Sequence, residues 1–146
     1  MTVQTKINKI LKIYKTVAVV GLSRSPNKES YMVSSYLKDN GFKIIPINPF
    51  ANKILGEKSY KRLLEIPFEI QRTIEIIDIF RPSTDVPKIV EEAIKLKKTH
   101  NLPYVIWMQL NIVNDEAAKI ARNAGFTVIM NRCMMIEHSK LFHETL

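Results

Sequence analysis

Short apolar runs alternate along this chain with longer segments in which apolar residues recur at helical spacing. The runs are rich in valine and isoleucine, and each is short enough to be one buried strand. The longer segments place apolar residues at i, i+3, i+4 and i+7, which is typical of a helix with one buried face. The predicted strands are 16–21, 43–48, 73–80, 104–108 and 126–130.

Glycines and capping residues mark the ends of the helices between these strands. Gly41 and Gly125 directly follow helical patterns, where the chain commonly takes a left-handed backbone. Asn114 is placed to cap one helix, and Ser83 or Thr84 can cap another. Repeated strand, helix and strand units with right-handed crossovers predict an α/β fold. We expect a Rossmann-like, doubly wound, mainly parallel five-stranded sheet with helices on both faces.

An amphipathic helix at about 2–15 precedes the first predicted strand. Ile7, Ile10 and Leu11 lie on its apolar side. A chain of 146 residues has the length of one ordinary domain, so we expect 1–146 to fold as a single domain. A homodimer through this helix is left open. Its solvated face carries Lys6, Lys9, Lys12 and Lys15.

Charge and cysteine content narrow the classes of partner. The net charge of +8 favours polyanions, but no zinc finger or aromatic RNA-binding sequence accompanies it, so nucleic acid is not the expected partner. The single cysteine, Cys133, cannot form an internal disulfide. No apolar stretch approaches the roughly 20 residues that a membrane span needs. We therefore expect a soluble, cytoplasmic protein with no membrane partner.

The segment GLSRSPNKES follows the first predicted strand, at the edge of the sheet where doubly wound folds bind ligands. Gly21 lets the backbone turn sharply there. The loop then offers backbone N–H groups, the hydroxyls of Ser23 and Ser25, and the cation of Arg24. The N-terminus of the following helix also attracts anions. These groups predict a site for a phosphate or pyrophosphate.

The same segment departs from the dinucleotide fingerprint G-x-G-x-x-G, because Ser23 and Pro26 replace its second and third glycines. The acidic residue that binds the ribose of NAD at the end of the second strand is also missing, since the chain there has Asn48 and Pro49. NAD is disfavoured on both counts. An NAD(P)-binding regulatory domain is kept as an alternative.

Five blocks of the chain resemble, in the same order, the single-domain CoA-binding proteins, whose fold is similar to the N-terminal domain of the succinyl-CoA synthetase alpha subunit. The resemblance extends from about Thr16 to Phe142. It implies a protein that binds coenzyme A or an acyl-CoA through the loop after the first strand. The blocks are VAVVGLSRSPNKESYMVSSYL, IPINPFANKILGEKSYKRLLEIP, DIFRPSTDVPKIVEEAI, VIWMQL and AAKIARNAGFTVIMNRCMMIEH.

The resemblance implies binding roles for three segments. The loop after the first strand would meet the CoA phosphates, and the turn after the second would lie at the adenosine end. A neutral turn suits the 3′-phosphate of CoA, which a carboxylate would repel. The third segment would border the nucleotide or the pantetheine arm. The implied residues are Gly21, Ser23, Arg24, Ser25, Asn27 and Ser30 for the phosphates, Asn48, Pro49 and Lys53 for the adenosine end and its 3′-phosphate, and Phe80, Arg81 and Pro82 for the third segment.

Two positions depart from the family pattern. Family members commonly have WMQLG and MDRC where this chain has Asn111 and Asn131, so the glycine and the carboxylate expected there are missing. Trp107, in the first of these motifs, is expected to pack at a strand end, with stacking on adenine left open.

The segment NRCMMIEH holds the best candidates for chemistry. Cys133, Glu137 and His138 would form a nucleophile and its base if they converged, which would make the protein a small acyl-CoA enzyme. The alternative is a buried cysteine beside hydrogen bonds that fix the C-terminal segment. We expect the second arrangement, with no catalytic residue. We also expect no metal site, because the histidines lack ligand spacing.

Overall fold

The computed structural model describes residues 1–143 and contains a five-stranded sheet whose strands are all parallel. The order across the sheet is β2-β1-β5-β6-β7. Each strand lies within one of the predicted apolar runs, so the predicted fold class is confirmed. The strands are β1 (Thr16–Val20), β2 (Lys43–Ile47), β5 (Ile76–Ile79), β6 (Val105–Met108) and β7 (Thr127–Ile129).

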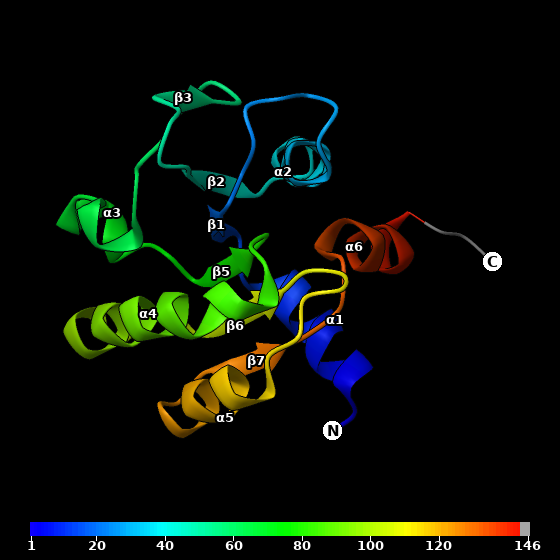
Figure 1. Ribbon diagram of the computed structural model, residues 1–146. Helices are drawn as coiled ribbons and strands as arrows, with labels where there is room; N and C mark the ends of the chain where they lie inside the picture. Colours follow the sequence, from blue (N-terminus) through cyan, green and yellow to red (C-terminus); the bar gives the residue numbers. More distant parts are fainter. Residues whose placement is uncertain (144–146) are drawn as a thin grey trace.

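Helices cover both faces of this sheet (Figure 1). On one face, apolar side chains of α1, α2 and α6 pack on one set of alternate strand residues, which includes Val17, Val19 and Trp107. On the other face, α4 and α5 pack on the intervening residues, among them Ala18 and Ile77. The helices are α1 (Val3–Ile13), α2 (Glu29–Asp39), α4 (Val86–His100), α5 (Asp115–Asn123) and α6 (Met134–Phe142).

The helix ends agree with the sequence at three positions and differ at a fourth. Asn114 caps α5 through its side-chain oxygen, which accepts from the N–H of Ala117 at 2.9 Å. Gly41 and Gly125 have the predicted left-handed backbone. The capping of α4 by Ser83 or Thr84 is wrong: both belong to the short 3-10 helix η2 (Ser83–Asp85), and no side chain caps α4. The Ser83 hydroxyl instead accepts from a backbone N–H of the loop before α5.

Four further elements have no counterpart in the apolar pattern. A two-stranded antiparallel hairpin, β3 (Lys53–Ile54) and β4 (Glu57–Lys58), turns at Leu55 and Gly56, which both have positive φ. The 3-10 helix η1 (Leu63–Glu65) and the short helix α3 (Phe68–Gln71) then lead to β5. Among residues 1–143, no helix is long and apolar enough to cross a membrane.

The interior strand β1 lies where the strand order reverses. The chain leaves β1 through α2 and returns as β2 on one side, and the later strands β5, β6 and β7 lie on the other side. The loops that follow β1 and β5 therefore diverge at the carboxyl ends of two adjacent strands. In open α/β sheets this topological switch point is where ligands bind.

The middle of the sheet also contains a buried carboxyl group. Asp78 in β5 is 0% exposed, and neither side-chain oxygen has a hydrogen-bond partner among the described residues. Its register partners are Val19 and Trp107, so its side chain lies on the face covered by α2 and α6. Burial raises the pKa of the Asp78 carboxyl well above its usual range, because the charged form loses its hydration.

Asp78→Asn is expected to stabilise the protein at neutral pH. Because the pKa of Asp78 is raised in the folded state, the residue is protonated in both states below its unfolded pKa of about 3.9 and costs no stability there. As the pH rises from that value toward the folded pKa, ionisation favours the unfolded state and the free energy of unfolding falls. Urea unfolding of the two proteins should therefore agree near pH 4 and diverge above it, by at most about 1.4 kcal/mol per pH unit. Asp39→Asn, at the exposed end of α2, is the matched control. If the free energies of unfolding of Asp78→Asn and of the unaltered protein changed in parallel with pH, the pKa of Asp78 would not be raised by folding.

Candidate functional site

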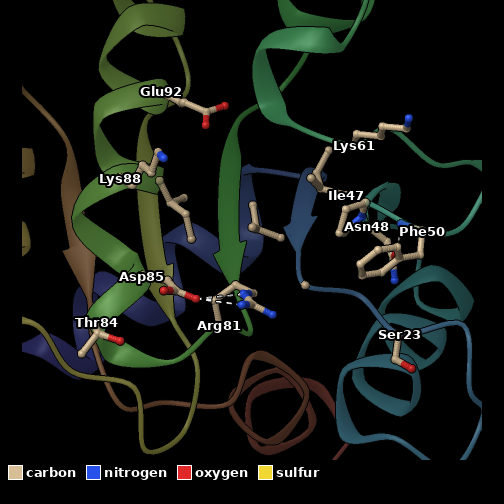
Figure 2. Close-up of a pocket in the computed structure, with 14 residues that line it drawn as sticks. Ser23, Ile47, Asn48, Phe50, Lys61, Arg81, Thr84, Asp85, Lys88 and Glu92 are labelled. Atoms are coloured by element: carbon tan, nitrogen blue, oxygen red, sulfur yellow. Dashed lines mark hydrogen bonds and ion pairs between the residues drawn. The ribbon is translucent and has the colours of Figure 1, made fainter.

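A cavity of about 630 Å³ opens at the carboxyl ends of β1, β2 and β5 (Figure 2). One wall comes from η2 and the first turns of α4, and the facing wall comes from the turn after β2. The floor is formed by the ends of β1 and β2. The lining residues are Val20, Gly21, Ser23, Ile47, Asn48, Pro49, Phe50, Lys61, Arg81, Thr84, Asp85, Lys88, Ile89 and Glu92.

Gly21 is required by a close approach of two chain segments at the base of this cavity. Its φ is +88°, and a Cβ built there would lie 2.7 Å from the backbone oxygen of Phe80 and 3.0 Å from Cδ of Arg81. The N–H of Gly21 donates to the carbonyl of Ile47 at 3.0 Å. The absence of a side chain thus lets the segment after β5 cross directly over the end of β1.

Serine hydroxyls shape the loop that follows Gly21. The buried Ser30 hydroxyl accepts from the N–H of Ser23 at 2.9 Å, and the Ser23 hydroxyl accepts from the N–H of Ser25 at 3.0 Å. These bonds tie the loop to the first turn of α2. The N-cap residue of α2, Lys28, makes no side-chain capping bond, so the first N–H groups of this helix have no cap from its own side chain.

Asn48 joins the loop after β1 to the turn after β2. Its side-chain N–H donates to the carbonyl of Leu22 at 2.9 Å, and its side-chain oxygen accepts from the N–H groups of Phe50 and Ala51 at 2.7 and 3.1 Å. This turn holds Phe50 at the rim of the cavity, where the ring is 85% exposed. A large aromatic side chain left so exposed at a cavity rim offers a flat apolar surface to a ligand.

The cavity walls carry three cationic and two carboxylate side chains. Arg81 donates from Nε and Nη2 to one oxygen of Asp85, at 3.2 and 2.8 Å. Lys61 and Lys88 lie on opposite walls in Figure 2. Glu92 lies 3.7 Å from Nε of Arg62. The positive charge of the walls thus exceeds the negative charge by one unit.

A second cavity, of about 270 Å³, shares Arg81 with the first. It lies between the N-terminus of α2 and the segments that follow β5 and β6. Its other lining residues are Glu29, Phe80, Pro82, Gln109, Leu110 and Ile112.

The structure brings seven of the twelve predicted binding residues to these two cavities. The remaining five belong to the loop after β1, to α2 or to β3, and line neither cavity. The first cavity contains Gly21, Ser23, Asn48, Pro49 and Arg81, the second contains Phe80, Arg81 and Pro82, and outside both lie Arg24, Ser25, Asn27, Ser30 and Lys53.

Sequence reasoning missed most of the α4 wall of the first cavity. Thr84, Asp85, Lys88 and Glu92 follow Arg81 at intervals of three and four residues, which places them on one side of the η2 and α4 segment. This spacing is visible in the sequence and could have identified them once Arg81 was assigned. Phe50, Lys61 and Ile89 were also missed.

At Asn111 and Asn131 a left-handed turn and a side-chain acceptor are present, although the expected glycine and carboxylate are not. Their φ angles are +68° and +59°, and asparagine tolerates this left-handed region better than most residues. The side-chain oxygen of Asn131 accepts from the N–H of Asn111 at 2.7 Å. An amide oxygen therefore acts as acceptor here, and the turn forms without a glycine.

The cluster around Cys133 forms contacts that fix α6. The Cys133 side chain is buried, and no hydrogen bond joins its thiol to His138 within residues 1–143. His138 Nδ1 pairs with the hydroxyl of Tyr36 at 2.8 Å, and Glu137 accepts from Gln4 at 3.1 Å. Burial, followed by the charge of Lys15, lowers the pKa of His138.

Trp107 and the histidines offer no ligand group to the cavities. Trp107 is 0% exposed, and its indole N–H donates to the carbonyl of Arg132 at 2.8 Å, so its ring cannot stack on a ligand in either cavity. Within the described residues, no group of three or more histidine, cysteine, aspartate or glutamate side chains could hold a metal ion.

The fold and the cavity define a Rossmann-like α/β domain of the kind that binds its ligand at the carboxyl ends of the central strands. Residues 15–139 match the family described as CoA binding domain, and the chain belongs to this family. The YneT protein of Bacillus subtilis (strain 168) is 37% identical over 136 residues, which cover 93% of this chain and 94% of YneT.

The chain is also similar to solved structures of small proteins and to part of a longer protein. Prb, the PH1109 protein redesigned for binding, is 35% identical with a TM-score of 0.88, over 100% of this chain and 96% of Prb. A protein of Pyrococcus horikoshii OT3 is 37% identical with a TM-score of 0.85, over 96% of this chain and 92% of that chain. The ADP-forming acetate–CoA ligase II of Archaeoglobus fulgidus is 41% identical over 80 residues, but the match covers only 11% of the ligase.

Gly21→Ala is expected to destabilise the protein more than Gly41→Ala. Both glycines have φ near +90°, which costs an alanine about 1–2 kcal/mol. Only at Gly21 does the added Cβ meet backbone, whereas nothing lies within 4 Å of the corresponding position at Gly41. Urea unfolding should therefore show an additional loss of roughly 1–3 kcal/mol for Gly21→Ala. Equal losses would show that the segments at Phe80 and Gly21 can separate at no cost.

Proposed function

We propose that this protein binds coenzyme A or an acyl-CoA in the cavity at the switch point, without catalysing a reaction on it. The main support is the lining of that cavity, which combines cationic side chains with an exposed aromatic ring and a neutral turn after β2. CoA has the matching chemistry, since it carries an adenine base, three phosphate groups and an uncharged pantetheine arm. Membership of the CoA binding domain family supports the same ligand.

The adenosine end of CoA binds between the turn after β2 and α4. Phe50, exposed at the rim, stacks on the adenine. Lys61 and Lys88 line the same cavity and bind the 3′-phosphate. We prefer these two lysines to Lys53, which lies exposed in the β3–β4 hairpin and lines neither cavity.

The pyrophosphate binds where the two cavities meet. Arg81 lines both, and its contact with Asp85 uses only Nε and one hydrogen of Nη2, which leaves further N–H donors for an anion. Asp85 therefore orients the guanidinium without occupying all of it. Gly21 and Ser23 form the adjacent backbone, and the N-terminus of α2 adds a favourable dipole.

The turn after β2 favours CoA over NAD. An NAD site usually has an acidic side chain near this position to accept from the ribose hydroxyls. Here the oxygen of Asn48 already accepts two backbone N–H groups, and its N–H group donates to Leu22. An NAD site therefore receives no support from this turn, and NADP is distinguished from CoA by the nucleotide panel below.

The absence of catalysis is supported by the state of the most reactive side chains. Cys133 is 3% exposed and lines neither cavity, and His138 and Glu137 hydrogen-bond to groups that fix α6. A nucleophile must reach both its base and the substrate. The matching acetate–CoA ligases are much longer proteins, and their activity is not part of this proposal.

Thermal unfolding with a panel of nucleotides tests the proposed ligand. CoA at about 100 times its dissociation constant should stabilise the fold by roughly 2.7 kcal/mol and raise the midpoint by about 5 °C or more. Dephospho-CoA should raise it less at the same concentration, because it lacks the 3′-phosphate. A larger shift with NAD or NADP would favour the regulatory alternative, and no shift with any nucleotide would contradict the proposal. Release of free thiol from acetyl-CoA would contradict the absence of catalysis.

Phe50→Ala is expected to weaken CoA binding by roughly 5- to 100-fold, the range for one base stacked on an aromatic side chain. Isothermal titration with fragments locates the loss: adenosine 3′,5′-bisphosphate should be weakened similarly, and 4′-phosphopantetheine should not. Phe68→Ala, at a second exposed ring outside the cavity, is the matched control. If Phe50→Ala weakens both fragments equally, the ring does not stack on the base.

A further inference from the structure

The second cavity shares one lining residue, Arg81, with the first. A pantetheine arm that extends from a pyrophosphate at Arg81 toward the N-terminus of α2 would therefore lie beside the second cavity. Its walls combine the apolar side chains of Phe80, Leu110 and Ile112 with the polar side chains of Glu29, Arg81 and Gln109. The far end of the arm, which carries the thiol or the acyl group, therefore reaches the neighbourhood of Gln109.

Gln109 has an unused hydrogen-bond donor in this wall. The residue is 1% exposed, and its side-chain oxygen accepts from the N–H of Met134 at 3.1 Å. That bond fixes which end of the amide faces α6. The side-chain nitrogen, Nε2, has no partner among the described residues. A buried donor without an acceptor costs about 1–3 kcal/mol, so an acceptor supplied by a ligand is favoured.

We propose that the second cavity binds the thioester end of a short, uncharged acyl-CoA, with Nε2 of Gln109 donating to the thioester carbonyl oxygen. This inference rests on the proposed CoA site. A free thiol is a weak acceptor, so CoA itself satisfies Gln109 poorly. Nε2 is shielded from solvent, so the thioester reaches it with a rotamer change at the cavity mouth, where Leu110 is 43% exposed.

The walls of the cavity define the kind of acyl chain. Phe80, Leu110 and Ile112 offer apolar contacts to a few methylene groups, and the volume of about 270 Å³ restricts the chain to a short one. Glu29, the first residue of α2, adds a carboxylate to the wall. The free carboxylate of a succinyl chain would be repelled by it. Acetyl and butyryl groups therefore fit, and a succinyl group does not.

Isothermal titration of the intact protein with CoA, acetyl-CoA, butyryl-CoA and succinyl-CoA tests this inference. Acetyl-CoA and butyryl-CoA should bind about 5- to 10-fold more tightly than CoA, as one additional hydrogen bond implies. Succinyl-CoA should bind more weakly than butyryl-CoA. Equal affinity for CoA and acetyl-CoA would overturn the inference and leave the proposed CoA site intact, whereas failure of CoA itself to bind would overturn the proposed function. Tight binding of succinyl-CoA would overturn the assigned class of acyl chain.

Two variants of Gln109 identify the group responsible. Gln109→Glu keeps an oxygen for the N–H of Met134 but removes the donor, and Gln109→Met removes the amide without adding charge. In both, the ratio of the affinities for acetyl-CoA and CoA should fall to about one. Gln71→Met, at a second glutamine buried to a similar extent and outside both cavities, should keep the ratio of the unaltered protein. A preference for acetyl-CoA that survives both substitutions would overturn the role of Gln109.

Discussion

The close approach of Gly21 to the carbonyl of Phe80 is the constraint on which both cavities depend. The ends of three strands meet here, since Gly21 donates to Ile47 and Phe80 donates to Val20. With no side chain on Gly21, the chain after β5 crosses the end of β1 and places Arg81 between the two cavities. A larger residue would separate β1 from the segment after β5, and therefore the loop after β1 from Arg81. The glycine is thus required by packing between segments as well as by its own backbone angle.

Local structure controls the electrostatics of the site more than the net charge does. The chain carries +8, but the exposed lysines of α1 line neither cavity. Within the first cavity, Arg81 is held by Asp85, and the walls retain an excess of one positive charge. A guanidinium that is already fixed by an ion pair loses less side-chain entropy on binding a phosphate than an unfixed guanidinium does. The acidic residue thus contributes order to a site that we propose binds anions.

The sequence was sufficient for the sheet, and seven of the twelve predicted binding residues line the two cavities, but most of the α4 wall was missed. Apolar runs identified all five strands because each is buried on both faces. The departure from G-x-G-x-x-G and the neutral Asn48 could be recognised in the sequence because both are local features. Lys61, by contrast, reaches the cavity because Tyr60 pairs with Ile47 beside β2, a contact between segments that no local pattern shows. The hairpin before it turns at Leu55 with positive φ, a conformation that leucine rarely adopts.

Asp78 and Gln109 show that a buried polar group without a hydrogen-bond partner is a candidate binding group only where it lines a cavity. Both have side-chain atoms without a partner among the described residues, and both lie on the face covered by α2 and α6. Asp78 lines neither cavity and is enclosed by the sheet and its helices, so protonation lowers the cost of its burial. Gln109 cannot change its charge, but it lines a cavity next to the proposed CoA site. The same desolvation cost therefore affects stability at one position and, in our proposal, ligand selectivity at the other.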